Sequence, residues 1–166
     1  MIRRLTVVDE IEASQRLRYK VWSGEGVTIH ETEQAKIGDP QDGSASHWGA
    51  YVGGVLIASS RLSFHDSLEG APDGHMFKNI PLPLPVGDIN RLVVQAGYRR
   101  LGISEAMDSL RIAYARSVGC RVVLACPIKS PVRMEGLLKH GFVFTGVDGK
   151  ADWGDMPTTG AYLLLD

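Results

Sequence analysis

The stretch from residue 88 to 119 constrains the fold most, because it predicts a strand, a tight loop and a long helix in direct succession. An apolar, β-rich run ending at Val94 indicates the strand, and Gln95 and Gly97 interrupt it. Gly119 suits the position just past the end of the helix. Apolar residues recur at three- and four-residue spacing before it, and they predict one buried helical face made of Ile103, Ala106, Met107, Leu110, Ala113 and Tyr114.

The charged residues of this helix are expected mostly on its other side, facing water: Glu105, Asp108, Arg111 and Arg116. An earlier helix is predicted to begin at a capping-box pattern formed by Asp9 and Glu12 and to run to about Trp22. Its two arginines, Arg16 and Arg18, are likewise expected near water.

The loop between strand and helix has the features of an anion site. Gly102 lets the backbone approach a bulky anion closely, and the unpaired N–H groups of residues 100–104 would point outward at the positive end of the helix dipole. Arg99 and Arg100 add positive charge at the rim, which suits a pyrophosphate better than a single carboxylate. The loop alone is equally compatible with a plain strand-to-helix connection.

The order of residues 93–104, VVQAGYRRLGIS, resembles the Arg/Gln-x-x-Gly-x-Gly/Ala signature of the GNAT superfamily of acyl-CoA N-acyltransferases. Two positions depart from it: Ala96 stands where proline is common, and Ser104 replaces the second small residue. The segment LLKHGF at 137–142 resembles the Leu-Tyr-x-x-x-Gly-Phe ending of the same superfamily. In element order, the resemblance runs from about His47 to Phe144.

This resemblance implies a single α/β domain over residues 1–166. A mixed central sheet of about six to seven strands would be splayed at its central pair and flanked by about four helices. The cosubstrate implied is acetyl-CoA or another acyl-CoA. A main-chain amide near Val93, beside a β-bulge, would stabilise the oxyanion, with a contribution of about 3 kcal/mol. The implied cofactor-binding residues are Leu92, Val93 and Val94 for the pantetheine arm, and Arg99, Arg100, Leu101, Gly102, Ile103 and Ser104 for the phosphates.

An amine acceptor must lose a proton before it attacks a thioester. Asp88 aligns with a carboxylate that often serves as the base in related enzymes, a role worth roughly 10²- to 10⁴-fold in rate. It could equally pair with Arg91 or solvent, and His65 is a rival base. Leu137 occupies the position of the tyrosine that protonates the leaving thiolate in many members. Water, Tyr98 or Tyr114 would have to replace it, unless the thiolate leaves unassisted.

Residues 88–94, DINRLVV, also resemble the Glu-x-x-Arg-Leu/Phe-x-Val strand of acyl-homoserine lactone synthases and N-acyl amino acid synthases. Residues 18–22, RYKVW, resemble another segment of those enzymes. On this interpretation Arg91 holds the acceptor's carboxylate or orders the N-terminal loop; the alternative is an arginine satisfied by local carbonyl groups. The chain is shorter than expected for those synthases, which leaves less wall for a long acyl tunnel.

The remaining segments predict further elements of one domain. Two strands, 47–52 and 55–64, are joined by Gly53-Gly54 as a hairpin. An irregular insert at 65–87 contains alternating prolines that favour extended backbone. A buried strand at 121–126 precedes a helix from Ser130-Pro131 to His140. Further strands are expected at 142–145 and 161–165, with a polar loop at 148–159 that holds Trp153.

Composition excludes some classes of protein. A net charge of -1 argues against nucleic-acid binding, and no apolar run reaches membrane-spanning length, so a cytoplasmic protein is expected. Cys120 and Cys126 flank a short strand about 20 Å long, so they are expected to be free thiols. His30, Glu31 and Glu33 lack metal-ligand spacing, and no metal is expected.

The sequence therefore predicts an N-acyltransferase that moves an acetyl or other acyl group from a CoA thioester to a primary amine by direct attack. One alternative is a synthase that takes its acyl chain from an acyl carrier protein, with an amino-acid-like acceptor. Another is a domain that binds acyl-CoA without turnover. The expected partner is a small-molecule amine or amino-acid-like acceptor, with neither nucleic acid nor membrane. A homodimer is compatible with the resemblance.

Overall fold

A computed structural model describes residues 1–26, 29, 33–152 and 154–165. Seven strands form one mixed sheet in the order β1-β2-β3-β4-β5-β7-β6, in which only β4 and β5 are parallel neighbours. The strands are β1 (Ile2–Leu5), β2 (Ser46–Val52), β3 (Val55–His65), β4 (Val86–Val94), β5 (Val122–Ala125), β6 (Val143–Lys150) and β7 (Pro157–Leu164). The helices are α1 (Val8–Ser23), α2 (Ile103–Ser117) and α3 (Pro131–Lys139).

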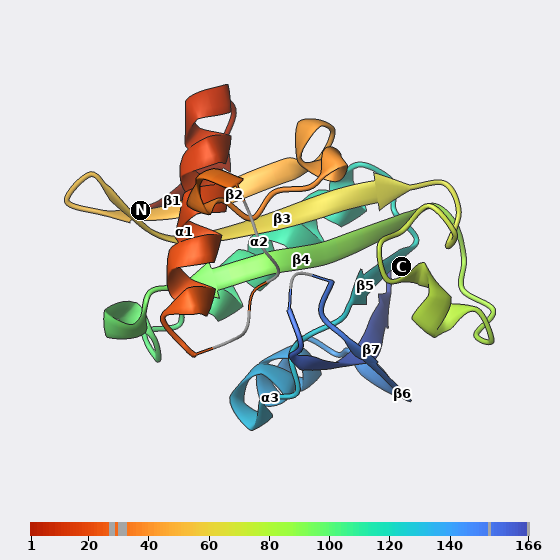
Figure 1. The fold of residues 1–166 in the computed structure, drawn as a ribbon. Coiled ribbons are helices and arrows are strands. Elements are labelled where there is room, and N and C mark those ends of the chain that lie inside the picture. The colour runs from red at the N-terminus through yellow and green to blue at the C-terminus, as the bar shows by residue number, and fades with distance from the viewer. Residues whose placement is uncertain (27–28, 30–32, 153, 166) are drawn as a thin grey trace.

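The sheet is covered on both faces (Figure 1). Helix α1 packs on one face, where Leu17 and Trp22 contact Val93 of β4. Helices α2 and α3 pack on the other face, where Ile112 and Leu137 join the main core. The α/β class and the mixed sheet are confirmed, with three α-helices in the described part of the chain rather than about four.

Local sequence signals explain most element boundaries. Gly53 and Gly54 both have positive φ, 56° and 79°, as the tight β2–β3 hairpin requires. Strand β5 is buried along its whole length, as its continuous apolar run predicts. Helix α2 ends at Ser117, and Gly119 follows it with a φ of 89°. Strand β6 extends well beyond the predicted residue 145, and β7 begins at Pro157 rather than 161, so much of the predicted polar loop is strand.

Three expectations about helix starts and faces are wrong. Helix α1 begins at Val8 after Val7, and no side chain caps it, so the predicted Asp9 capping box does not form. Arg18 is fully buried. In α2, Asp108 and Arg111 are buried, whereas Leu110 is 42% exposed. The pattern of apolar residues misplaces these side chains because buried polar contacts hold them: Arg18 pairs with Asp42, Asp108 pairs with Arg111, and Arg111 also donates to main-chain carbonyl groups of the sheet.

The insert between β3 and β4 (residues 66–85) packs on the same face of the sheet as α1, against strand ends that α1 does not cover (Figure 1). It contains a short 3-10 helix, η3 (Gly74–Phe77), whose Met76 and Phe77 pack against Val86, Val122 and Leu124. The insert is therefore attached to the strands β4 and β5 where these pair. No described helix is both long enough and apolar enough to cross a bilayer.

Candidate active site

Strands β4 and β5 separate part of the way along their length. Their parallel pairing runs from Val86 opposite Val122 to Ile89 opposite Ala125 and stops there. Residues 90–94 of β4 continue without a partner from β5, while residues 127 and 128 after β5 pair with β7. The predicted splay at the central pair is confirmed, and it leaves one edge of β4 available to an extended ligand.

The predicted bulge lies at the same place. Arg61 pairs with Asn90 and Ser59 with Val93, so Ser60 alone faces Arg91 and Leu92. Arg91 takes a left-handed φ of 54°. The bulge re-aims the strand, so that Leu92 and Val94 pack toward α2 while Val93 packs toward α1.

The loop before α2 has the geometry of an anion site. Gly102 precedes the helix with a φ of 75°, and a Cβ placed on it would meet no protein atom within 4 Å. Among the described residues, no acceptor bonds the N–H groups of residues 100–105. These amides therefore point outward at the positive end of the helix.

The two arginines of this loop differ. Arg99 donates from Nε to the carbonyl oxygen of Val94 at 3.1 Å and forms an ion pair with Glu25. Arg100 is exposed and takes a left-handed φ of 62°. Arg99 thus ties the loop to the end of β4, whereas Arg100 projects its charge into solvent.

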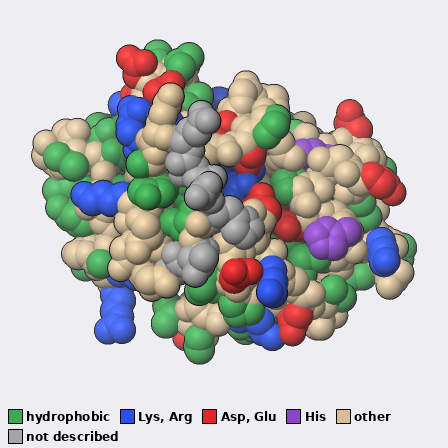
Figure 2. All heavy atoms as spheres, in the orientation of Figure 1, with side chains coloured by type: hydrophobic (Ala, Val, Ile, Leu, Met, Phe, Trp, Pro, Cys, Tyr) green, Lys and Arg blue, Asp and Glu red, His purple; other side chains and the backbone are tan. Residues whose placement is uncertain are grey.

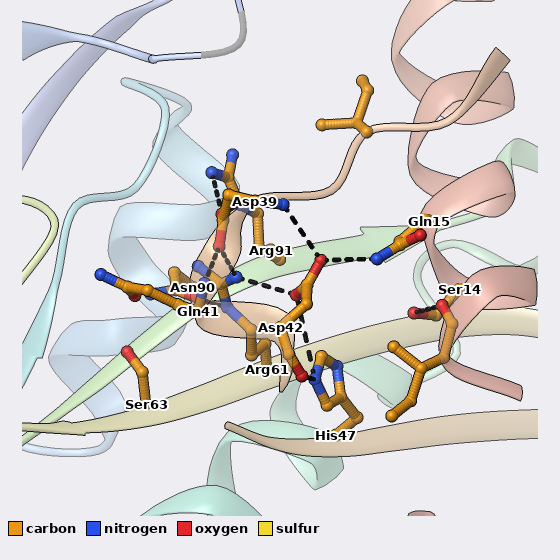
Figure 3. A network of polar contacts seen from close by, with 12 residues as sticks. Ser14, Gln15, Asp39, Gln41, Asp42, His47, Arg61, Ser63, Asn90 and Arg91 are labelled. Carbon is orange, nitrogen blue, oxygen red and sulfur yellow. Dashed lines mark hydrogen bonds and ion pairs between the residues drawn. The ribbon is translucent and has the colours of Figure 1, made fainter. Parts of the chain in front are cut away.

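A network of ion pairs covers the bulge on the α1 face (Figure 3). Arg91 donates to Asp39 at 2.6 Å and makes a bidentate contact with Asp152, at 2.7 and 2.9 Å. Arg61 contacts Asp39 at 2.5 Å, Asp42 at 2.8 Å and the side-chain oxygen of Asn90 at 2.7 Å. Arg91 therefore links the bulge of β4 to Asp39 of the N-terminal loop and to Asp152.

Asp42 is the centre of this network. It accepts hydrogen bonds from Arg18 at 3.0 Å, Arg61 at 2.8 Å and Gln15 at 2.9 Å. Burial alone would raise the pKa of Asp42, but Arg18 and Arg61 together lower it below its usual range. Burial lowers the pKa of Arg18 to about 10, which still leaves it charged at neutral pH.

Asp88, the predicted base, lies on the same face of β4 and is fully buried. Neither of its carboxylate oxygens has a hydrogen-bond partner among the described residues. Burial raises its pKa to about 8, with a further contribution from the negative charge of Asp73, and Arg61, Asn90 and Arg91 oppose this rise only in part. Asp88 does not pair with Arg91, so that predicted alternative is wrong.

The other candidate proton donors and acceptors occupy different parts of the fold. His65 contacts the hydroxyl of Ser63 at 2.9 Å, and Ser63 stands opposite Asp88 in the sheet. Leu137 is buried in the main core and has no polar atom to offer. The hydroxyl of Tyr114 accepts a hydrogen bond from Arg4 of β1 at 3.1 Å. Tyr98 packs beside Leu92 and Val94.

A second ionic network lies on the opposite face, against α2. Arg111 is fully buried and donates from Nη1 to the carbonyl oxygens of Arg61 and Asn90, at 3.0 and 3.2 Å. Asp108 pairs with both Arg111 and Arg133 of α3. Arg111 thus supplies donors to carbonyl groups beside the bulge, where the regular ladder is interrupted.

Sequence reasoning missed Asp39, Asp42, Arg61, Asp73 and Asp152. A signal existed for two of them. Asp39 precedes Pro40 and Asp42, and it forms a capping box at the start of the 3-10 helix η2 (Pro40–Gly43). Arg61 lies in the middle of the strand β3, and a charged residue in a buried strand indicates an ion pair. His30, Glu31 and Trp153 lie outside the described residues, and no metal-binding group of side chains occurs among those described. Both cysteines are free thiols, as predicted.

The fold is shared with solved acyltransferases. FeeM, an N-acyl amino acid synthase from uncultured soil microbes, has a TM-score of 0.73 at 15% identity, covering 99% of this chain and 94% of its own. BjaI, a CoA-dependent acyl-homoserine lactone synthase solved with SAM and isopentyl-CoA, has a TM-score of 0.73 at 16% identity, covering 100% and 83%. A GNAT phosphinothricin acetyltransferase from Sinorhizobium meliloti, solved with AcCoA, has a TM-score of 0.66 at 14% identity, covering 99% and 88%.

The sequence itself matches the Acetyltransferase (GNAT) family over residues 8–142. The chain belongs to this family and is an acyltransferase of the GNAT type, as its signature residues predict. A comparison with curated protein sequences gives no significant match.

Proposed function

We propose that this enzyme transfers an acetyl or other acyl group from a CoA thioester to a primary amine by direct attack. One observation carries the proposal: the outward-pointing amides of residues 100–105 lie at the start of α2, close in sequence to the edge of β4 that β5 leaves unpaired. A diphosphate bound to those amides would leave its pantetheine arm free to extend along the unpaired edge. Both halves of an extended cofactor site thus belong to one continuous segment.

On the donor side, Leu92 to Val94 would contact the pantetheine arm, and residues 99–104 would hold the phosphates. A main-chain amide near Val93 would stabilise the oxyanion formed on the thioester carbonyl, a contribution of about 3 kcal/mol. The bulge at Arg91 supports this role, because it interrupts the ladder where such an amide must be free.

On the acceptor side, Asp88 would remove a proton from the attacking amine. A base with a pKa of about 8 is suited to an ammonium group, whose own pKa lies near 10. The N–C bond then forms as the C–S bond breaks. The departing thiolate takes a proton from water or from Tyr98, or it leaves unassisted and is protonated afterwards.

A second candidate is a synthase with an amino-acid-like acceptor, with its acyl chain delivered by CoA or an acyl carrier protein. The bidentate contact between Arg91 and Asp152 favours it, because the side chain of Asp152 is 64% exposed and that of Arg91 only 7%. An acceptor carboxylate could take the place of Asp152 on Arg91 with the same geometry. The named activities of FeeM and BjaI add support.

The test is amine-dependent release of free thiol from acetyl-CoA and longer acyl-CoA donors, measured with a panel of amines and amino acids. The parent enzyme should release thiol only when both substrates are present. A domain that binds acyl-CoA without turnover would instead show protection against heating by CoA and no amine-dependent thiol.

Gly102→Val tests the phosphate site. We expect its CoA affinity to fall at least about tenfold, since a side chain would occupy the space that the diphosphate needs. Gly119→Val is the matched control, because Gly119 also has a positive φ and open space around it but lies at the other end of α2. Equal CoA affinity in Gly102→Val and Gly119→Val, measured by calorimetry, would refute the placement.

A further inference from the structure

Asp88 is closed off from solvent. The residue is fully buried, and neither of its carboxylate oxygens has a hydrogen-bond partner among the described residues. A base must release the proton that it takes from one acceptor before it can act on the next. In a buried place this release needs a neighbouring group that accepts a proton and passes it on. The groups next to Asp88 in the sheet therefore matter for turnover.

Ser63 of β3 is the cross-strand partner of Asp88. The two residues stand directly opposite each other in the antiparallel ladder, an arrangement that places Cβ atoms about 4.5–5.5 Å apart on one face of the sheet. Ser63 is 2% exposed and lies on the same side of β3 as Arg61 (Figure 3). A hydroxyl and a carboxyl group on opposite residues can reach each other when their side chains turn, directly or through one water.

His65 connects Ser63 to the surface. Its Nε2 lies 2.9 Å from the hydroxyl oxygen of Ser63, which comes two residues earlier on the same face of β3. The ring is partly exposed, and its Nδ1 lies 3.7 Å from the position of a Cβ on Gly70, an exposed residue of the insert. The imidazole thus extends from a buried hydroxyl toward the outside of the molecule.

The charges around His65 leave its ring able to accept a proton. Burial, together with the positive charge of Arg61, lowers the pKa of His65, and the negative charge of Asp66 opposes this only in part. A neutral imidazole has one nitrogen that accepts a hydrogen bond and one that donates. A hydroxyl can accept one hydrogen bond while it donates another. Ser63 and His65 can therefore continue a chain of hydrogen bonds that begins at Asp88.

We propose that Ser63 and His65 form a proton relay that carries the proton taken up by Asp88 to solvent. This inference rests on the proposed function, in which Asp88 removes a proton from the acceptor amine, and it adds the step that restores the base. Neither residue has to touch the acceptor, so both are positioning residues that act through Asp88. The relay gives a role to the contact between a buried hydroxyl and a partly exposed imidazole on the strand next to the base.

Every proton has a defined destination. The ammonium group of the acceptor gives one proton to Asp88, and the neutral nitrogen attacks the thioester carbonyl. The N–C bond forms, the C–S bond breaks, and the second nitrogen proton leaves with the thiolate as free thiol. Protonated Asp88 donates to the oxygen of Ser63, whose own proton moves to Nε2 of His65, and Nδ1 releases a proton to water. Exchange with water then returns the ring to its first tautomer.

The kinetic test is thiol release with an alkylamine in His65→Ala. We expect kcat to fall about tenfold, a small part of the roughly 10²- to 10⁴-fold that a positioned base supplies, while KM for the amine stays near the parental value. Added imidazole should restore most of kcat, because it can take the proton from Ser63 in place of the missing ring. His75→Ala, at an exposed histidine of the insert, is the matched control and should keep the parental kcat with or without imidazole.

Ser63→Ala tests the link between the base and His65. We expect a similar loss in kcat, since the relay is then interrupted at its first step. The double variant Ser63→Ala/His65→Ala should lose no more than either single variant, because both changes break one path. A parental kcat in His65→Ala, a loss that imidazole does not restore, or losses that multiply in the double variant would each overturn the relay.

Nitrogen NMR of the histidine rings tests the relay separately from catalysis, so a parent that releases no thiol would count against the proposed function alone. At neutral pH, His65 should be uncharged with its proton on Nδ1, and its Nε2 signal should shift in Ser63→Ala because the donor is lost. A proton on Nε2, or an unchanged Nε2 signal in Ser63→Ala with parental melting temperature, would show that Ser63 does not pass a proton to His65.

Discussion

Two ionic networks meet the same bulge from opposite faces of the sheet, and they differ in how completely they are closed. On the α2 face, Arg111 and Asp108 are buried and bonded to each other, and Arg133 completes the set. On the α1 face, the network ends at the exposed Asp152, and the buried Asp88 on the same face of β4 has no hydrogen-bond partner among the described residues. The closed network braces the fold, whereas the open one has charges available for a ligand.

Charged side chains of both signs also reach the surface on the α1 face (Figure 2). Figure 2, seen from the α1 side, shows acidic and basic side chains close together near the middle of that face. They lie in the region between α1 and the β6–β7 end of the sheet (Figure 1). We expect the acceptor to enter from this face, because the exposed Asp152 pairs there with Arg91.

The largest effect should come from breaking the closed network. Arg111→Met leaves Asp108 with a single partner and removes the donor from two buried carbonyl groups, so we expect a loss of about 3–5 kcal/mol in the free energy of unfolding. Urea denaturation measures it. Arg116→Met, in the exposed last turn of the same helix, should change stability by about 0.5 kcal/mol or less. If the two variants were equally stable, the closed network would not be a structural brace.

The two kinds of buried carboxyl group should respond to pH in opposite ways. Arginines lower the pKa of Asp42 and Asp108 despite burial, so their contribution is present above the unfolded value of 3.8 and is lost as pH falls through the lower folded pKa. The pKa of Asp88 is raised to about 8, so its contribution is present below 3.8 and is lost as pH rises toward 8.

Asp88→Asn should therefore flatten the stability profile at neutral pH. In the parent we expect the free energy of unfolding to fall by up to about 1.4 kcal/mol per pH unit between pH 5 and 8 on account of this group. Urea titrations at several pH values measure the slope. A parent and an Asp88→Asn variant with the same slope would show that Asp88 titrates normally in the folded enzyme.

The smallest effect on stability is expected at Asp152, where the open network of the α1 face ends. Asp152→Asn should change the free energy of unfolding by about 1 kcal/mol or less, since its side chain is 64% exposed. If an acceptor carboxylate displaces Asp152 from Arg91, this variant should lower KM severalfold for amino acids and leave KM for simple alkylamines unchanged. A uniform change in KM for both acceptor types would argue against a carboxylate site at Arg91.

Much of the backbone could be predicted from the sequence. The strand, loop and helix of residues 88–119, the Gly53-Gly54 hairpin and the buried β5 all follow from apolar periodicity and glycine position. The bulge was predictable because Arg91 could not share a face with Ile89 and Val93 in a regular strand. These signals are local, so they survive without knowledge of tertiary contacts.

The charged interior could not be predicted in the same way. A hydrophobic pattern assigns Arg18, Asp108 and Arg111 to the surface. The spacing of Asp108 and Arg111 allows an ion pair, but nothing local shows that this pair is buried. Arg18 pairs with Asp42, which lies 24 residues away. Asp73 was missed for the same reason, because its effect on the pKa of Asp88 arises from the fold and not from neighbours in the sequence.

The strand order β5-β7-β6 has a consequence for how the enzyme is made. Strand β7 lies between β5 and β6 in the sheet. One edge of β5 therefore has no hydrogen-bonding partner until residues 157–164 have been synthesised. During that interval the unpaired, fully apolar strand β5 can aggregate with other nascent chains. We therefore expect production of this enzyme to depend on chaperones more than its modest length suggests.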